Sequence, residues 1–263
     1  MDNRSLNQRR LVALIYFVAD HETDLPVALI TGAGRGIGRA VAIALARAGY
    51  ALCLAARSSD QLAETRAMSG LEPKLALIVL VDLADLDAPD NLFGAVMDHF
   101  GRLDLLVNNA GYDPPRRPLL KIGRSDQDRM VSVNLRAPIA LTRMAAEQMA
   151  QQRQGGTIIN IASDSALKAP SGESIYAATK AGLLAFTRCC AAEFRDYGVR
   201  TSVIAPGLTD TSFIPQNKRL DRTAMLRPED VAAAVLAIVN APAHICPVEI
   251  VLEPARNPMR GGH

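Results

Sequence analysis

A glycine-rich segment that directly follows an apolar run is the feature that most narrows the folds open to this chain. The segment Thr31–Gly38 contains four glycines and lies between the run Val27–Thr31 and a stretch of helical character. Glycines permit a tight turn and a close approach of the backbone to a ligand, and the helix that follows offers unpaired N–H groups to an anion. Although the spacing is T-G-x-x-x-G-x-G rather than G-x-G-x-x-G, the placement predicts a strand, a turn and a helix that bind a dinucleotide. A turn without a ligand is the alternative.

Short apolar runs alternate with longer helical stretches over most of the remaining chain. This alternation is typical of βαβ units and of a parallel sheet covered on both faces. The expected strands are 27–31, 51–55, 75–81, 103–108, 157–162, 200–205 and 248–252, and the expected helices are 37–48, 60–68, 89–99, 126–151, 175–196 and 228–239. Ser125 with Asp128 is predicted to cap the helix that starts at 126, and Gly49, Gly101 and Gly198 are predicted to end other helices. The pattern therefore predicts an α/β, doubly wound Rossmann fold with a seven-stranded parallel sheet.

Length and composition favour one domain and a small-molecule partner. The chain has 263 residues, of which 49 % are hydrophobic, and this is enough to build a substantial core. Its net charge is +2, with 29 basic and 27 acidic residues in no long runs, so we expect no nucleic-acid surface. The four cysteines form no C-x-x-C pair, which favours free thiols in a reducing, cytoplasmic setting. We expect no metal site.

The expected domain spans residues 25–254. An apolar run from Leu11 to Ala19 follows Arg9 and Arg10 and imitates a secretory signal, but it has only nine residues and no A-x-A-like cleavage site follows it. We therefore expect residues 1–24 to be an N-terminal extension, either packed on the domain or partly disordered, and no membrane span. Residues 255–263 are expected to form a flexible tail.

A tyrosine and a lysine four residues apart are the strongest candidates for chemistry. Tyr176 and Lys180 fall on a predicted helix, where an i, i+4 pair shares one face. A free phenol has a pKa of about 10 and is a poor proton donor or acceptor at neutral pH, whereas a nearby cation lowers that pKa by about 1–3 units. The spacing predicts that Lys180 activates Tyr176. A half-buried ring beside a solvated ammonium is the alternative.

The end of the second expected strand bears on the choice of nucleotide. NAD-binding proteins of this fold place an acidic residue there, whereas this chain has Ala55, Ala56 and Arg57. Arg57, with Arg35 of the glycine segment, could pair with a 2′-phosphate, so NADP(H) is favoured over NAD(H). Asp82, after the third expected strand, is placed to contact adenine, although it could equally cap a helix.

Taken together, the motifs resemble those of the short-chain dehydrogenase/reductase family. They are the glycine segment, Asn108–Gly111 after the fourth expected strand, Ser163 after the fifth, Tyr176-x-x-x-Lys180, and Pro206–Gly207 after the sixth. The resemblance covers residues 25 to about 254, and Ser163 precedes Tyr176 by the family's thirteen residues. It implies an enzyme of one Rossmann domain that transfers hydride between a nicotinamide and a carbonyl or secondary alcohol.

The resemblance also implies roles for individual residues. Ser163 would polarise the substrate carbonyl, Tyr176 would transfer the proton, Lys180 would lower the pKa of Tyr176 and hold the nicotinamide ribose, and Asn134 would complete the catalytic set. Asn108 would mainly stabilise the centre of the sheet. The expected cofactor contacts are Gly32, Gly34, Arg35, Gly36, Ile37, Gly38, Arg57, Asp82, Leu83, Asn109, Ala110, Gly111, Tyr176, Lys180, Pro206, Gly207, Thr209 and Thr211.

Pro138 adds a feature at Asn134. Proline has no N–H, so in a helix the carbonyl of Asn134 lacks its usual partner four residues later. We hypothesise that this carbonyl holds a water molecule that links Asn134 to Lys180. A helix kinked for packing is the alternative.

The sequence does not name a substrate. Residues 208–227 are expected to be a polar, mobile lid, and the final strand reads Val251-Leu252-Glu253-Pro254 in place of the family's frequent D-G-G ending. Some relatives reduce 3-oxoacyl groups carried on acyl carrier protein and engage this acidic partner with arginines. At the positions aligned with two such arginines this chain has Gln154 and Tyr197, with Arg153 and Arg195 near them. A 3-oxoacyl thioester substrate therefore stays open. The family also implies a homotetramer or homodimer. A nucleotide-sensing regulator without catalysis is the alternative function.

Overall fold

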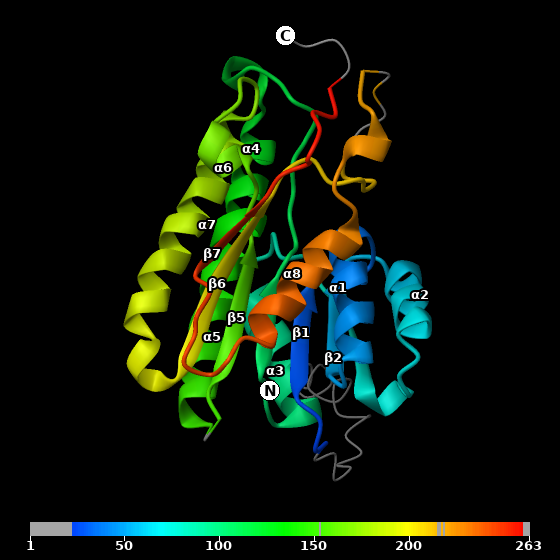
Figure 1. Ribbon diagram of the computed structural model, residues 1–263, viewed down its shortest axis with the longest axis vertical. Coiled ribbons are helices and arrows are strands. Elements are labelled where there is room, and N and C mark those ends of the chain that lie inside the picture. Colours follow the sequence, from blue (N-terminus) through cyan, green and yellow to red (C-terminus); the bar gives the residue numbers. More distant parts are fainter. Residues whose placement is uncertain (1–22, 153, 215–216, 218, 260–263) are drawn as a thin grey trace, which may run out of the picture.

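The sheet has the predicted composition and direction. A computed structural model describes residues 23–152, 154–214, 217 and 219–259. In this part of the chain seven parallel strands form one sheet in the order β3-β2-β1-β4-β5-β6-β7 (Figure 1). The strands are β1 (Val27–Thr31), β2 (Ala51–Ala56), β3 (Ala76–Leu80), β4 (Leu105–Asn108), β5 (Gly156–Ile161), β6 (Val199–Pro206) and β7 (Glu249–Leu252). The Rossmann prediction is confirmed.

Helices cover both faces of this sheet. The α-helices are α1 (Gly36–Arg47), α2 (Ser59–Ser69), α3 (Ala88–Phe100), α4 (Arg124–Val131), α5 (Ala137–Gln151), α6 (Ser165–Lys168), α7 (Ser174–Glu193) and α8 (Pro228–Val239). Short 3₁₀ segments are η1 (Pro73–Leu75), η2 (Leu119–Lys121), η4 (Arg195–Tyr197) and η5 (Arg222–Ala224). Buried residues of α1, α2 and α8 form one apolar cluster with the strands, and those of α3, α5 and α7 pack on the opposite face. The core therefore consists of two apolar layers, one on each face of the sheet.

The predicted helix 126–151 is not continuous. It is divided into α4, a π-helical segment η3 (Ser132–Arg136) and α5. Pro138 cannot donate to the carbonyl of Asn134, and the backbone widens there, with the N–H of Ala137 bonded to the carbonyl of Ser132. The predicted capping box is wrong, because Gly123 precedes the first turn of α4 and no side chain caps it. The helix ends predicted at Gly101 and Gly198 are confirmed, since both adopt the left-handed conformation after α3 and η4.

A buried chain of amides connects the centre of the sheet to α7. Asn108 donates from Nδ2 to Oδ1 of Asn160 at 2.9 Å, and Asn160 donates to Oγ1 of Thr187 at 2.9 Å. All three side chains are buried. Unpaired buried amides are costly, so this chain fixes α7 relative to β4 and β5. It agrees with the structural role expected of Asn108.

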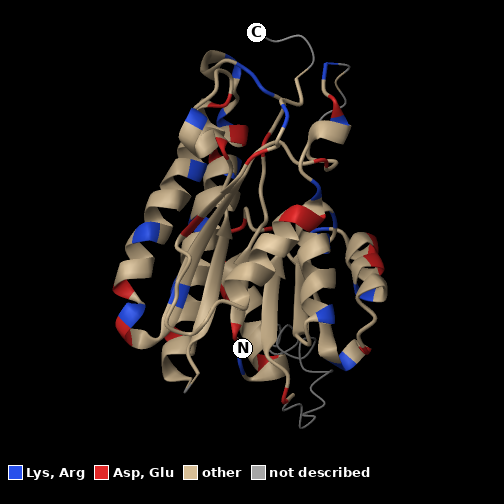
Figure 2. Cartoon of the chain, viewed as in Figure 1, with Lys and Arg blue, Asp and Glu red and all other residues tan. Residues whose placement is uncertain are grey.

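Charged residues of both signs are interspersed over the outer helices, whereas the central strands carry few of them (Figure 2). Among the described residues, no helix combines the length and apolar character needed to cross a bilayer. The expected N-terminal extension lies almost wholly outside the described residues. In the expected C-terminal tail, Met259 forms an isolated bridge with Leu220, and the N–H of Asp221 donates to the carbonyl of Pro258 at 2.7 Å. The described part of the tail therefore contacts the segment expected to be the lid.

Candidate active site

A cleft of about 550 Å³ lies at the carboxyl ends of the strands. Residues after six of the seven strands contribute to it, as parallel sheets of this topology require. Of the predicted site residues, those that line the cleft are Gly32, Arg35, Gly36, Ile37, Arg57, Asp82, Leu83, Asn109, Ala110, Gly111, Ser163, Tyr176, Lys180, Pro206, Gly207, Thr209 and Thr211. The cleft thus gathers most of the expected nucleotide contacts and three of the four expected catalytic residues.

The glycine loop is shaped to approach a ligand closely. Gly36 has a φ of +54°, and a Cβ there would lie 3.2 Å from Thr211. Helix α1 begins at Gly36 without a side-chain cap, and no acidic residue occupies its first turn. Its first N–H groups and the positive end of its dipole therefore face the cleft, which fits the pyrophosphate of a dinucleotide.

Two predicted contact residues lie behind the loop instead of in the cleft. A Cβ on Gly38 would lie 2.3 Å from the carbonyl oxygen of Gly32, so Gly38 is needed for packing within the loop. Gly34 faces α2, where a Cβ would lie 3.0 Å from Cβ of Gln61. Both glycines shape the loop, and neither lines the cleft.

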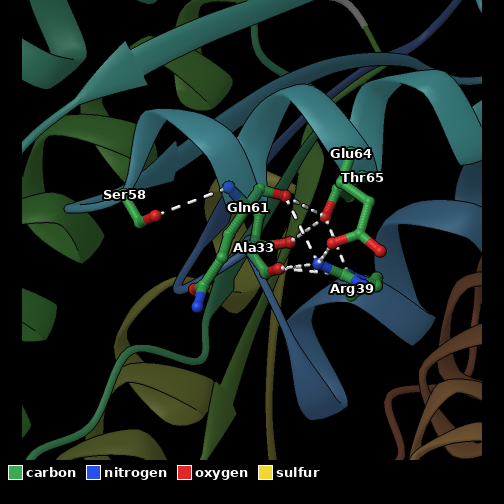
Figure 3. Close-up of polar contacts among 7 residues, drawn as sticks. Ala33, Arg39, Ser58, Gln61, Glu64 and Thr65 are labelled. Carbon is green, nitrogen blue, oxygen red and sulfur yellow. Dashed lines mark hydrogen bonds and ion pairs between the residues drawn. The ribbon is translucent and has the colours of Figure 1, made fainter.

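Arg39 holds the loop against α2, and sequence reasoning missed it (Figure 3). Its guanidinium donates to the carbonyl of Gly34 at 3.1 Å, to Oγ1 of Thr65 at 3.1 Å and to the carboxylate of Glu64 at 2.6 Å. Thr65 in turn donates to the carbonyl of Ala33 at 3.0 Å. A loop that stands open for a ligand leaves its outer carbonyls without partners in a helix or sheet, and these side chains satisfy two of them. The only sequence signal was an arginine one turn into α1.

Thr31 and Asn109 hold the other side of the loop. Oγ1 of Thr31 accepts from the N–H groups of Asn109 and Ala110, both at 3.0 Å, and Nδ2 of Asn109 donates to the carbonyl of Thr31 at 2.8 Å. These bonds join the end of β1 to the end of β4. The expectation that Asn109–Gly111 would line the cleft agrees with this placement.

The end of β2 carries free positive charge. Arg57 is exposed, and neither its guanidinium nor that of Arg35 makes a hydrogen bond or ion pair with the rest of the described chain. Asp82, expected to contact adenine, is already engaged: Arg129 bonds its carboxylate at 2.6 Å, and the N–H of Ala84 bonds it at 3.1 Å. Burial acts to raise the pKa of Asp82, but these hydrogen bonds together hold it below its ordinary value.

The expected catalytic side chains converge from β5 and α7. Lys180 lies on the same face of α7 as Tyr176, with Nζ 5.8 Å from the centre of the phenol ring. Nζ donates to the carbonyl of Ile161 at 2.8 Å, and Oγ of Ser163 accepts from the N–H of Ser165 at 3.1 Å. The hydroxyl of Ser163 donates to Oδ1 of Asp164 at 3.2 Å. The i, i+4 prediction of a shared face is confirmed.

Asn134 lies one layer deeper and does not line the cleft. Its side chain is fully buried; Oδ1 accepts from the N–H of Tyr112 at 2.7 Å, and Nδ2 donates to the carbonyl of Tyr112 at 2.8 Å. The amide thus fixes the loop after β4. The proposed water on the carbonyl of Asn134 stays a prediction, supported by the π-helical backbone around it.

The direction of the Tyr176 shift contradicts the expectation that Lys180 lowers the pKa of the phenol. Burial raises the pKa of Tyr176, and the negative charge of Asp113 raises it further, while Ser163 acts in the opposite direction. Burial also lowers the pKa of Lys180 to about 8. The sequence shows the spacing of the two groups but not their removal from water, and burial is the largest cause of both pKa shifts.

Several carboxylates and a phenylalanine near Tyr176 were also missed. Asp113 lines the cleft beside Tyr176, and the buried Glu173 pairs with Arg116 and accepts from Oγ of Ser165 at 2.6 Å. Phe213, from the expected lid, lies with its ring centre 6.4 Å from that of Tyr176. In the sequence, Asp113 stands two residues after N-N-A-G, Phe213 follows P-G by six residues, and Glu173 precedes Tyr176 by three. On the same side, Glu253 of the unusual C-terminal ending pairs with Lys168 at 2.8 Å.

Known proteins are similar in sequence to this domain. Residues 26–221 match the family model described as short chain dehydrogenase. The chain is 32 % identical over 228 residues to an uncharacterized oxidoreductase of Staphylococcus aureus (strain MRSA252), covering 87 % of this chain and 96 % of the relative. It is 34 % identical over 230 residues to L-rhamnose 1-dehydrogenase (NAD(P)(+)) of Azotobacter vinelandii, covering 81 % and 88 %.

A solved structure agrees with these matches. The 3-ketoacyl-(acyl-carrier-protein) reductase of Brucella melitensis, complexed with NADH, superposes with a TM-score of 0.80 at 27 % identity. The match covers 88 % of this chain and 98 % of that one. The similarity therefore spans the Rossmann domain and both sides of the cleft.

Proposed function

Because the chain belongs to the short-chain dehydrogenase family, we propose that it is an NADP(H)-dependent oxidoreductase that interconverts a carbonyl compound and a secondary alcohol. The observation that carries the proposal is the convergence of Ser163, Tyr176 and Lys180 on the cleft that begins at the glycine loop. The bound nicotinamide would supply or accept the hydride. The chain itself must bind and polarise the carbonyl and move one proton.

The polar groups of the cleft suit that proton transfer. Ser163 donates a hydrogen bond to the substrate oxygen, and the phenol of Tyr176 gives its proton to the same oxygen as negative charge develops there. Because burial raises the pKa of Tyr176, the phenol stays protonated at neutral pH. This is the form that donates the proton in reduction. Lys180 is held beside the ring by the carbonyl of Ile161.

Replacing Tyr176 with Phe tests this assignment. The variant should lose at least about 100-fold in kcat for NADPH-dependent ketone reduction, since a general acid contributes about that much, while the Kd for NADPH stays unchanged. Tyr197→Phe is the matched control, because that ring is exposed on η4, away from the cleft. Full activity of Tyr176→Phe would refute the mechanism. A wild-type protein that binds NADPH but reduces no ketone or 3-oxoacyl thioester would favour the nucleotide-sensing alternative.

The NADP(H) preference is supported by Arg35 and Arg57. No carboxylate stands at the end of β2, and both guanidiniums line the cleft without a partner in the described chain. A charge-assisted bond to a 2′-phosphate is worth about 1.5–3 kcal/mol, so Arg57→Ala should raise the Kd for NADPH by about 10- to 100-fold and leave the Kd for NADH unchanged. Arg47→Ala, on the exposed end of α1, is the control. Equal weakening of both nucleotides would contradict the preference.

The proposal extends to a substrate and to an assembly. Similarity to the Brucella reductase makes a carrier-bound 3-oxoacyl thioester one substrate to test. Of the two arginines considered above for contact with the carrier protein, Arg195 is exposed on η4, and Arg153 lies outside the described residues. We also propose that the protein assembles as a homodimer or homotetramer. Exposed apolar side chains at Val131 and Ile139 on α4 and α5 support it, and light scattering measures it.

A further inference from the structure

We propose that Asp113 determines substrate specificity by accepting hydrogen bonds from the hydroxyl groups of an uncharged, hydroxylated carbonyl substrate. The inference rests on the proposed function and names its substrate class. Asp113 follows β4 and lines the same cleft as Ser163 and Tyr176. Its charge acts on both Tyr176 and Lys180, which line that cleft with it.

Within the described residues, Asp113 differs from the other carboxylates at this end of the cleft in having no partner. Glu173 pairs with Arg116 and with Ser165, and Asp164 pairs with Lys168 at 2.9 Å. Across the described part of the chain, the carboxyl of Asp113 makes no hydrogen bond and no ion pair. A carboxyl that is half removed from water and left without donors is costly to the fold, which indicates that a ligand supplies the donors.

The surroundings of Asp113 disfavour its ionised form. Burial, followed by the charge of Glu173, raises the pKa of Asp113 to about 6, although Arg116 and Lys180 act to lower it. The group is therefore largely ionised at pH 7.5 and needs hydrogen-bond donors. A purely structural residue would be expected to gain stability from its surroundings rather than lose it.

The charges around Asp113 favour a neutral donor. An anionic substrate would be repelled by the carboxylate, and a cationic one would meet the ammonium of Lys180. An apolar ketone would cover the carboxylate and leave it unpaired, which costs about 1–3 kcal/mol, or about 5- to 150-fold in binding. A substrate with a hydroxyl group near its carbonyl satisfies the group without adding charge.

A pair of ketones with matched shape tests this specificity. Dihydroxyacetone and 3-pentanone have the same number of heavy atoms and differ only in hydroxyl against methyl groups. With saturating NADPH at pH 7.5, the wild type should reduce dihydroxyacetone with a kcat/KM about 10- to 100-fold above that for 3-pentanone. Asp113→Ala should lose most of that ratio, and Asp113→Asn, which keeps one acceptor oxygen, should retain part of it. Asp98→Ala, on the exposed face of α3, should leave the ratio unchanged.

The outcomes separate specificity from a structural role. Loss of the ratio with an unchanged Kd for NADPH supports the proposal. An equal fall for both ketones in Asp113→Ala, or a wild type that prefers 3-pentanone, overturns it. If the wild type reduces neither ketone, ligand-observed NMR of dihydroxyacetone with the NADP⁺-bound protein decides. If the wild type and Asp98→Ala bind dihydroxyacetone and Asp113→Ala does not, the inference is supported even though the proposed function fails for these ketones. If the wild type and Asp113→Ala bind it equally, or the wild type does not bind it, the inference is overturned.

Discussion

Replacing Gly38 with Ala should destabilise the protein and weaken nucleotide binding, although alanine is the better helix former. Gly38 lies in the first turn of α1, and an added Cβ would lie 2.3 Å from the carbonyl oxygen of Gly32 and 2.5 Å from Nδ2 of Asn109. Both distances are about 1 Å shorter than ordinary contacts, and one partner is backbone that cannot rotate away. The loop must shift, and the hydrogen bond from Asn109 to Thr31 shifts with it.

The magnitude follows from three contributions. Overpacking costs about 1–3 kcal/mol, a distorted hydrogen bond costs about 0.5–1.5 kcal/mol, and the helix propensity of alanine returns about 1 kcal/mol. The net loss is about 1–3 kcal/mol, which corresponds to a fall in Tm of about 2–4 °C for each kcal/mol in a chain of this size. Because the shifted loop presents the N–H groups of α1, the Kd for NADPH should rise about tenfold.

Gly94→Ala is the matched control. Gly94 is also helical, in α3, but a Cβ there meets nothing within 4 Å. The variant should gain up to about 1 kcal/mol from helix propensity and bind NADPH as the wild type does. Tm is measured by calorimetry at fixed protein concentration, and the Kd by NADPH fluorescence titration. A Gly38→Ala protein with the Tm and Kd of the wild type would refute the role assigned to this contact.

Three further predictions concern residues around the cleft. Arg39→Met leaves the carbonyl of Gly34 without its donor, so it should raise the Kd for NADPH about tenfold and lower the free energy of unfolding by about 1–2 kcal/mol. The control is Arg143→Met, which breaks an exposed ion pair with Glu147 and should change neither quantity when NADPH binding and unfolding are measured in the same way. Asp113→Asn should be more stable than the wild type by about 1 kcal/mol at pH 8 and equal to it at pH 4. The reason is that burial and Glu173 raise the pKa of Asp113 to about 6, so the wild type loses stability as the pH rises through that value; urea unfolding at both pH values measures it, and a gap that widens toward acid pH would contradict it. Pro138→Ala restores an N–H that can bond the carbonyl of Asn134, so kcat should fall severalfold with NADPH binding unchanged, and an unaltered kcat would argue against the water relay.

Sequence alone determined the features that depend on local spacing. Alternating apolar runs fixed the strands and their order along the chain, because a strand or helix buries a face with its own period. The glycines from Gly32 to Gly38 marked the turn, and the four-residue separation of Tyr176 from Lys180 put both on one face of α7. The break at η3 was missed although its cause, Pro138, was visible, and the short helix α6 was missed as well.

Only the tertiary structure decided the features that depend on contacts between distant segments. Arg39 fixes the loop through α2, and Asn134 bonds the backbone of Tyr112. Asp113 lines the cleft with Tyr176 and Lys180 and has no partner among the described residues. The direction of the pKa shift of Tyr176 also reversed, because the penalty for burying a charge depends on every segment that covers it, and no spacing along the chain records that cover.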